Sequence, residues 1–403
     1  MRKLCLIIGI VIIIGFWIEW WSYLHEGKGA IQTIIQQKIS FDQIKGKETS
    51  HRILKSFHHL ENDQISSLYL VAGGDIMISR NIGALNRKDG YDRIFKEENL
   101  YPITSFPNCT GKNCLLFFNL ESLFSKTDND DPYGGFIFKS NLKNIETLLQ
   151  LRGDHQILFS LANNHTSNVG HEGVVTTREL LKEHQLPWIG VGENSEESRE
   201  MYILQQKNLK ICFSTYSYDG NAGVIVRGGK ISWNPMRETD ILEDLEKMKT
   251  LQCDAKIISL HRGNEYRIKP TEQQKQLAYH LIDAGADLIL GNHSHIPSAF
   301  ERYKGKMIFY SFGNFIFDQE RGKTENGKGF DYIYDYSLKR KTVPTYLSLL
   351  WGFLIFKRGD TTEIILDKLV MDTTTQGVHF HADEKTSSEY LEQLNLSKIP
   401  FTS

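Results

Sequence analysis

Residues able to bind a metal ion follow several apolar runs that have the length and composition of buried strands. The clearest run, residues 288–290, passes through Gly291 into Asn292, His293 and His295. We read it as a strand that turns at Gly291 and presents these side chains at its carboxyl end. Two imidazoles two residues apart can address one centre, because neutral imidazole is a common metal ligand. Taken alone, the pair is equally compatible with an ordinary surface turn.

Other apolar runs end in the same chemistry, which favours the metal site over the turn. The runs cover residues 68–72, 115–119, 156–162 and 255–260, and they lead respectively into Asp75, Asn119 with Glu121, Asn164 with His165, and His261. The carboxyl ends of parallel strands meet at one edge of a sheet, where α/β folds bind ligands. Mixed oxygen and nitrogen donors suit one or two ions of zinc, manganese or iron better than calcium, which prefers oxygen. A carboxylate between two ions can bridge them for displacement at phosphorus.

Helical periodicity between these runs predicts the elements that position the site. Helices are expected at residues 142–151, 172–184, 241–251 and 271–284, the last with Thr271 as its N-cap. Further strands are expected at residues 188–192, 209–214, 306–311, 345–356 and 362–369. Alternating strands and helices predict an α/β fold with a parallel sheet. The strand-rich later part predicts a mixed or second sheet packed against it.

The composition is that of a globular protein. Of 403 residues, 40% are hydrophobic and 24% are charged, and the formal net charge of -2 argues against a whole-molecule footprint for nucleic acid. The 5 cysteines are too few and too scattered for a disulfide scaffold, and no Cys-x-x-Cys pair occurs. Cys109 and Cys114 flank a turn-forming stretch. A local disulfide and two free thiols are both compatible with that arrangement.

The amino-terminal residues have the features of a membrane anchor. Arg2 and Lys3 precede an apolar run over residues 4–18, and Trp20 and Trp21 follow it. The run is at the short end for a bilayer, its aromatic flank suits a membrane interface, and no small-residue cleavage site follows. We expect an uncleaved single-pass anchor, with a cleaved signal peptide as the alternative. The predicted organisation is anchor 1–25, stalk 26–66, main domain 67–375 and polar tail 376–403, with everything after the anchor outside the cytoplasmic membrane.

The ordered motifs resemble the CapA/PgsA family of poly-γ-glutamate capsule synthesis proteins, which is similar to the calcineurin-like metallophosphoesterases. The motifs are GDIMISR (74–80), NLE (119–121), LANNH (161–165), HRGNEY (261–266), DAGADLILGNHSH (283–295) and FYSFGNFIFD (309–318). The resemblance covers residues 67–370. It implies a calcineurin-like α/β sandwich of two mixed β-sheets flanked by helices.

The resemblance also implies roles for individual residues. As metal ligands it implies Asp75, Glu121 in the bridging place, Asn164, His261, His293 and His295. His165 takes the place of the acid or orienting group beside the scissile bond, a role that suits its near-neutral titration. The supporting or substrate-binding candidates are Arg80, Asn119, Glu265, Asn292 and Asn314. Two positions depart from the pattern: Met77 replaces a usual hard ligand, which puts one metal site in question, and Asn168 replaces an acidic residue that often contacts the histidine.

A membrane-anchored capsule protein is therefore the leading hypothesis. It is expected to act in assembly, elongation, export or attachment of poly-γ-glutamate, beside the membrane polymerase and transporter subunits of a capsule synthase. The lysine and arginine residues at 321–328 and 339–341 are candidates for binding the polyanionic polymer, with an ordinary solvated surface as the alternative. If the protein is an enzyme, we expect a metallophosphoesterase-like hydrolase or transferase. The alternatives are an exported metal-dependent phosphoesterase with an unrelated substrate and a non-enzymatic scaffold for the synthase.

Overall fold

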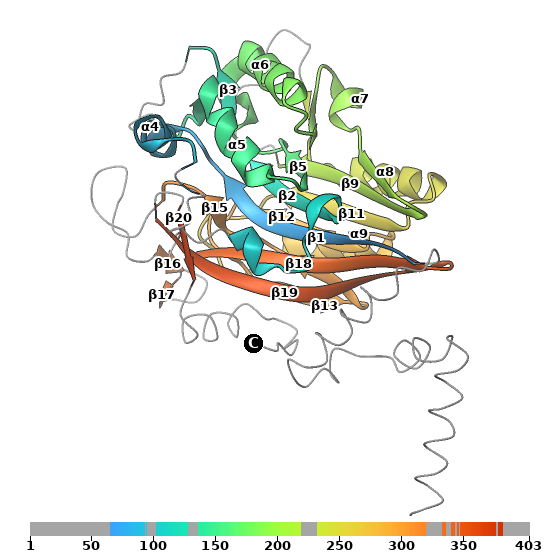
Figure 1. Cartoon of the computed structure of the whole chain (residues 1–403). Coiled ribbons are helices and arrows are strands. Elements are labelled where there is room, and N and C mark those ends of the chain that lie inside the picture. Colours follow the sequence, from blue (N-terminus) through green and yellow to red (C-terminus); the bar gives the residue numbers. More distant parts are fainter. Residues whose placement is uncertain are drawn as a thin grey trace, which may run out of the picture. The chain divides into compact units, whose positions relative to one another are not determined.

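The computed structural model of the chain (Figure 1) describes residues 65–92, 94, 102–127, 136–218, 232–319, 333–335, 340–342, 345, 347–375 and 378–381. All of them belong to one structural unit, Glu61–Lys398. The predicted anchor, nearly all of the stalk and most of the tail lie outside the described residues. Within those ranges, no helix has the length and apolar character needed to cross a membrane.

The first large sheet combines a parallel half with an antiparallel half. The parallel strands are β1 (Ile65–Ile76), β2 (Cys114–Leu120), β5 (Gln156–Ser160), β6 (Trp188–Ile189) and β15 (Asn314–Ile316), the last paired with β1. The antiparallel strands are β18 (Leu347–Arg358), β19 (Thr361–Thr375) and β20 (Val378–His381), and the order is β20-β19-β18-β1-β2-β5-β6. Every residue of β2 is buried, as expected for a parallel strand covered on both faces.

The second large sheet is also mixed. Its parallel strands are β9 (Leu209–Ser217), β11 (Ala255–His261), β12 (Leu288–Asn292) and β14 (Lys306–Phe309). The antiparallel strands β8 (Tyr202–Gln206) and β13 (Phe300–Tyr303) form its edges, in the order β13-β14-β12-β11-β9-β8. Each predicted strand is present, so the expected α/β fold with two mixed sheets is confirmed.

Aromatic side chains join the two sheets face to face. Phe117 of β2 stacks on Phe213 of β9, with ring centroids 5.8 Å apart. Trp351 of β18 contacts Phe300 and Phe309 of the second sheet at centroid distances of 5.0 and 4.7 Å. These large rings are almost completely buried, so the core lies between the sheets.

Helices cover the sheets on their other faces. On the second sheet, α8 (Glu238–Thr250) and α9 (Glu272–Asp283) bury their apolar stripes against β9, β11 and β12. Helix α9 starts with a capping box in which Thr271 and Gln274 bond each other's backbone, as its predicted N-cap requires. Helices α5 (Ile145–Arg152) and α6 (Gly170–Glu183) lie beside β5 and the short strand β3 (Leu123–Ser125) (Figure 1). The four predicted helices are therefore confirmed.

Several short elements were not predicted. They are α4 (Arg80–Asp89), α7 (Ser195–Ser198), β3 (Leu123–Ser125), β4 (Lys139–Asn141), β10 (Ser232–Trp233), β15, β16 (Ile333–Asp335) and β17 (Arg340–Thr342), with 3-10 turns at Pro102–Ser105, Gly111–Asn113 and Thr166–Val169. The strand predicted at residues 188–192 forms two short strands, β6 and β7 (Val191–Gly192), and the helix predicted at residues 142–151 begins as a 3-10 turn at Leu142–Asn144. The edge strands β8, β13 and β20 were missed as well. Short or half-exposed segments carry little periodic signal, and pairing with a neighbour decides their structure.

Gly291 does not form the predicted turn. Strand β12 continues through Asn292, and a Cβ atom at Gly291 would collide with the carbonyl oxygens of Phe309 and Tyr310. Glycine is needed here because the backbone after β14 approaches closely, and the chain leaves the strand one residue later than expected.

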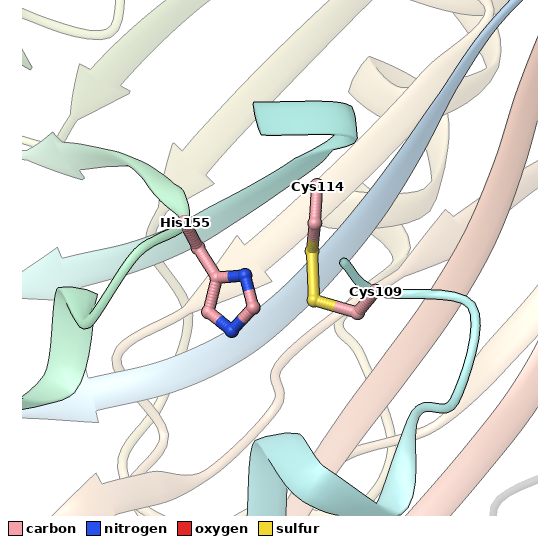
Figure 2. A group of neighbouring side chains, drawn as sticks. All are labelled: Cys109, Cys114 and His155. Atoms are coloured by element: carbon pink, nitrogen blue, oxygen red, sulfur yellow. A yellow bond between two sulfur atoms is a disulfide. The ribbon is translucent and has the colours of Figure 1, made fainter. Parts of the chain in front are cut away.

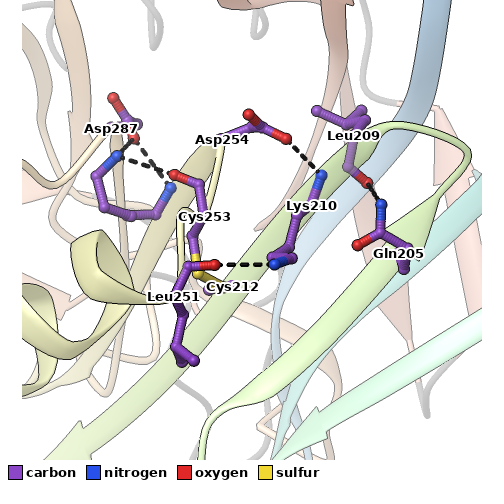
Figure 3. The surroundings of a disulfide bond; sticks show 9 residues. Gln205, Leu209, Lys210, Cys212, Leu251, Cys253, Asp254 and Asp287 are labelled. Atoms are coloured by element: carbon purple, nitrogen blue, oxygen red, sulfur yellow. Dashed lines mark hydrogen bonds and ion pairs between the residues drawn. A yellow bond between two sulfur atoms is a disulfide. The ribbon is translucent and has the colours of Figure 1, made fainter.

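Two disulfides link described residues. The local pair Cys109–Cys114 is formed, which decides between the two alternatives that the sequence left open. A second bond joins Cys212 of β9 to Cys253, which precedes β11, across 41 residues of sequence (Figure 3). Next to it, Lys210 Nζ donates to the Leu251 carbonyl at 2.8 Å (Figure 3). The second bond therefore joins β9 to the residues just before β11, and the segment between them contains α8.

Candidate metal centre

The carboxyl ends of strands from both sheets bring the predicted ligands together. In the first sheet, Asp75 at the end of β1 is in register with Asn119 of β2. In the second sheet, His261 at the end of β11 is in register with Asn292 of β12. Asn119 Nδ2 joins the two groups, because it donates to Asp75 Oδ1 at 2.8 Å and lies 3.2 Å from His261 Nδ1. The predicted ligands therefore converge, although they come from two sheets and not from the edge of one sheet as expected.

Asp75, Glu121 and His295 form a compact group of possible ligands. One donor atom from each lies within 4.8 Å of the others, and all three side chains are buried. Burial raises the pKa of Asp75 to about 7, although hydrogen bonds from Asn119 and the His293 backbone lower it. Burial, with the nearby charges of Asp75 and Glu265, raises the pKa of Glu121 well above its ordinary value. Two adjacent buried carboxylates favour a bound cation or a proton.

His261 connects this group to the end of β5. Its Nε2 lies 2.8 Å from Asn164 Oδ1 and 3.4 Å from Glu121 Oε1. Because Asn119 donates to Nδ1, the neutral ring carries its proton on Nε2 and donates to Asn164. Burial and the neighbouring histidines lower the pKa of His261 well below its ordinary value. Asn164 and His261 therefore lie where the resemblance placed them.

Asn314 orients His295. The Asn314 side chain donates from Nδ2 to the Thr345 carbonyl at 3.2 Å and to Gln319 Oε1 at 3.1 Å. Its Oδ1 is then the acceptor, 3.0 Å from His295 Nδ1. His295 consequently holds its proton on Nδ1, and Nε2 keeps a lone pair, as a metal-binding imidazole requires. Burial lowers the pKa of His295 to about 3.

His165 lies beside this centre in a second network. Asn168 Oδ1 accepts a hydrogen bond from the Phe138 backbone at 3.0 Å and lies 2.9 Å from His165 Nδ1. The contact that Asn168 put in question is thus present, made by an amide oxygen instead of a carboxylate. His165 donates from Nδ1, so Nε2 is its proton acceptor. The near-neutral titration expected for His165 is wrong here, because burial lowers its pKa to about 4.

Arg80 lies near both His165 and the candidate ligands, because its positive charge opposes the rise that burial causes in the pKa of Glu121 and adds to the fall that burial causes in the pKa of His165. Its guanidinium forms an ion pair with Asp318 and lies 4.7 Å from the centre of the Phe138 ring. The Phe138 ring also stacks on the imidazole of His165, with ring centroids 3.8 Å apart. Asp318 was not predicted, although it closes the last motif of the resemblance.

The remaining predicted residues also lie near the centre. Asn292 is fully buried, and Glu265 is close enough that its charge raises the pKa of Glu121. Met77 is buried, and the Ser79 hydroxyl donates to its sulfur at 3.0 Å, so the thioether is engaged within its own turn. Tyr218 was missed because the strand before it was expected to end at residue 214. Its hydroxyl lies 3.0 Å from His293 Nε2.

The backbone at the centre is strained. His293 has a φ of 103° and His295 a φ of 57°, values that favour glycine over a residue with a side chain. Such conformations cost about 1–3 kcal/mol each and cluster at functional sites. Histidine at these two positions therefore has a conformational cost that glycine would not have.

Comparing two small residues at position 293 tests that strain. The variants His293→Gly and His293→Ala both delete the imidazole, but only glycine adopts a φ of 103° freely. We expect His293→Gly to be more stable than His293→Ala by about 1 kcal/mol, measured by urea unfolding of the metal-free proteins. The usual order, with alanine more stable, would show that the backbone is relaxed at this position.

The donor set fits a divalent transition metal ion. Glu121 Oε2 and His293 Nδ1 are buried and have no hydrogen-bond partner among the described residues, and the same holds for both side-chain polar atoms of Asn292. Such orphaned atoms are costly unless something binds them. Asp75, Glu121, His293 and His295 would hold the ion, with oxygen and imidazole donors of the kind that zinc, manganese and iron accept. Asn164 and His261, the other two ligands that the resemblance implies, lie beside these four residues and bond each other at 2.8 Å, so their donor atoms are engaged in this structure.

A second group of possible ligands is not a metal site in this structure. Cys109, Cys114 and His155 have donor atoms within 4.8 Å of one another. Figure 2 shows that the two sulfur atoms are bonded to each other beside the imidazole ring. Because cysteine binds a metal ion as the free thiolate, and both sulfur atoms are used in the disulfide, this group is removed from consideration.

Comparison with known proteins gives a family match over most of the described region. Residues 69–319 match the family model described as "Bacterial capsule synthesis protein PGA_cap". The chain is 28% identical over 277 residues to "Capsule biosynthesis protein CapA" of Bacillus anthracis, covering 68% of this chain and 65% of that protein. It is 26% identical over 271 residues to "PGA biosynthesis protein CapA" of Bacillus subtilis, covering 66% and 67%. The match thus spans somewhat under two thirds of the first relative's length.

A comparison with solved structures found matches at low TM-scores. One is the calcineurin-like phosphoesterase YfkN from Bacillus subtilis, with a TM-score of 0.40 and 14% identity, covering 82% of this chain and 99% of that one.

Proposed function

Because the chain belongs to the bacterial capsule synthesis protein family PGA_cap, we propose that it acts in building a poly-γ-glutamate capsule through a divalent metal centre. The step it serves is assembly, elongation, export or wall attachment of the polymer. The chemistry is that of a metallophosphoesterase-like hydrolase or transferase. The identity of the family supports the pathway, and the site supports the chemistry.

One observation carries the metal chemistry: the buried, unpartnered oxygen and nitrogen atoms of Glu121 and His293. They lie in a cluster that also contains the adjacent carboxylate of Asp75 and the imidazole of His295. A site that served only to stabilise the fold would leave few such atoms without partners, because each one costs roughly 1–3 kcal/mol. A bound cation would supply Lewis acidity toward an electrophilic centre of the substrate.

The protein's own residues divide the remaining work. Asn119 holds Asp75 and His261 in place through one amide nitrogen. His165 presents Nε2 as a proton acceptor, because its Nδ1 is bonded to Asn168, and the Phe138 ring prevents it from turning. Its neutral form predominates at pH 7, since its pKa is lowered to about 4. His165 therefore takes a proton from the attacking group before it can return one to the leaving group.

The two disulfides support a location outside the cytoplasm. Cys109–Cys114 and Cys212–Cys253 would be reduced by the thiol systems of most cytosols, whereas oxidising compartments preserve such bonds. A single-pass anchor at residues 1–25 and partner subunits in the membrane are part of this proposal, as is binding of the polyanionic polymer. The basic segment at residues 321–328, a candidate for binding the polymer, lies outside the described residues. Nucleic acid is not among the partners that we propose.

Metal analysis of the purified full chain is the direct test. We expect about one or two equivalents of a divalent transition metal per chain, and loss of capsule when a strain lacking this protein is complemented with a His293→Ala variant. If the purified wild-type protein contains no metal, and if wild type and His293→Ala restore the capsule equally well, the non-enzymatic scaffold is favoured. A metal-bound protein that hydrolyses generic phosphodiesters but leaves capsule unchanged would favour the phosphoesterase with an unrelated substrate.

A further inference from the structure

Tyr218 touches the centre from the end of β9. Its hydroxyl oxygen lies 3.0 Å from His293 Nε2, and the two ring centroids are 4.8 Å apart. His261 flanks the same imidazole at a centroid distance of 4.8 Å. The His293 ring is thus held between a candidate ligand and a phenol that none of the sequence motifs contains. We infer that Tyr218 is a positioning residue that holds His293 in the orientation and tautomer required to bind the cation.

The position of Tyr218 is set by backbone contacts with the second sheet. Its backbone N–H donates to the His261 carbonyl at 3.2 Å. The preceding residue, Ser217, donates to the Asn234 carbonyl at 3.0 Å and accepts from Met236 at 2.7 Å. Because three hydrogen bonds fix the chain at this point, the hydroxyl group has a defined place from which to hold the imidazole.

The hydrogen-bond arrangement leaves the useful nitrogen free. His293 Nδ1 is buried and has no partner among the described residues, whereas Nε2 faces Tyr218. When Nε2 carries the proton and donates to the phenol oxygen, Nδ1 keeps its lone pair for a cation. Metal-binding histidines commonly donate their other ring nitrogen in this way, and the acceptor sets both tautomer and orientation.

The strained backbone increases the need for this contact. With a φ of 103°, His293 has a main-chain conformation that its own side chain disfavours. Its backbone N–H donates to Asp75 Oδ2 at 3.3 Å, so the main chain is held from one side. The Tyr218 hydroxyl holds the side chain from the other. Without it, the buried Nε2 atom loses its partner and the ring can rotate or exchange tautomer.

A titration of the full-length protein with Zn²⁺, in competition with a chromophoric chelator, tests the inference, which rests on the proposed metal site. We expect Tyr218→Phe to weaken Zn²⁺ binding roughly 10- to 100-fold. We also expect it to change the visible spectrum of the Co²⁺-substituted protein, with the metal-free melting temperature preserved. The matched control is Tyr202→Phe, which removes a hydroxyl from another half-buried tyrosine that packs on β9 away from the centre. It should behave as wild type.

A double-mutant comparison separates positioning from general damage. In a His293→Ala background, Tyr218→Phe should cause no further loss of Zn²⁺ affinity, because the ring that the hydroxyl holds is absent. Wild-type affinity and an unchanged Co²⁺ spectrum in Tyr218→Phe would overturn the inference alone. Absence of any Zn²⁺ binding by the wild-type protein would overturn the proposed metal centre as well. A loss in Tyr218→Phe that persists in the His293→Ala background would assign Tyr218 a structural role instead.

Discussion

Replacing Asp75 with asparagine should abolish metal binding and capsule production while making the metal-free protein more stable at alkaline pH. The variant keeps the shape of the side chain and loses the charge that lies within 4.8 Å of the Glu121 and His295 donor atoms. We expect Zn²⁺ affinity to fall by roughly a hundredfold or more. This loss is larger than the one caused by changing a residue that only hydrogen-bonds to a metal ligand. Competition titration measures the affinity, and complementation of a capsule-deficient strain measures the function.

The stability part of this prediction follows from the raised pKa of Asp75. Burial raises that pKa from 3.8 to about 7 in the folded chain. The folded protein therefore binds this proton more tightly than the unfolded chain does, and wild-type stability falls as pH rises from about 4 toward 7. Asparagine removes the penalty and relieves the neighbouring Glu121. The lowered histidine pKa values act in the opposite direction, but they are common to both proteins and cancel in the difference.

The comparison is made by urea unfolding of metal-free proteins at pH 4 and pH 8. The stability advantage of Asp75→Asn over wild type should appear at pH 8 and vanish near pH 4. Asp287→Asn is the control for metal binding, because Asp287 precedes the opposite end of β12 and pairs with Lys256 and Lys306. It should leave Zn²⁺ affinity unchanged. An Asp75→Asn protein that binds Zn²⁺ like wild type would remove Asp75 from the ligand set.

Removing the disulfide between Cys212 and Cys253 should destabilise the protein more than removing the local one. The loop-entropy relation gives about 4 kcal/mol for a separation of 41 residues and about 2 kcal/mol for a separation of 5. We expect the paired variant Cys212→Ala/Cys253→Ala to lower the melting temperature by roughly 5–10 °C. Both bonds connect buried sulfur atoms, so the two double variants remove chemically similar groups.

The variant Cys109→Ala/Cys114→Ala is the internal comparison for the long-range bond. Its smaller loss of melting temperature, measured by circular dichroism under the same oxidising conditions, would support the loop-length argument. Equal losses, or a larger loss for the local pair, would contradict it. A reducing agent should lower the melting temperature of wild type and leave a variant lacking the four disulfide-bonded cysteines unchanged, which also tests whether both bonds form in the purified protein.

The sequence by itself determined the strands, the helices and the polar residues that follow each strand. A continuous apolar run such as residues 156–160 must be buried, and the polar residues after it must mark its end, so this information is local. The N-cap at Thr271 follows from residue types only three positions apart. Parallel pairing aligns Asp75 with Asn119 in one sheet and His261 with Asn292 in the other, whereas the packing of the two sheets brings the two groups together.

Only the tertiary structure decided how those residues act. The pairing of Cys212 with Cys253, the contact of Tyr218 with His293, and the hydrogen bond between His295 and Asn314 all join residues that are distant in the sequence. Such contacts depend on how two sheets pack and on which way each side chain then points, and a linear pattern contains neither. The close approach at Gly291 also depends on tertiary structure, because the carbonyl oxygens of Phe309 and Tyr310 leave no room for a Cβ atom there.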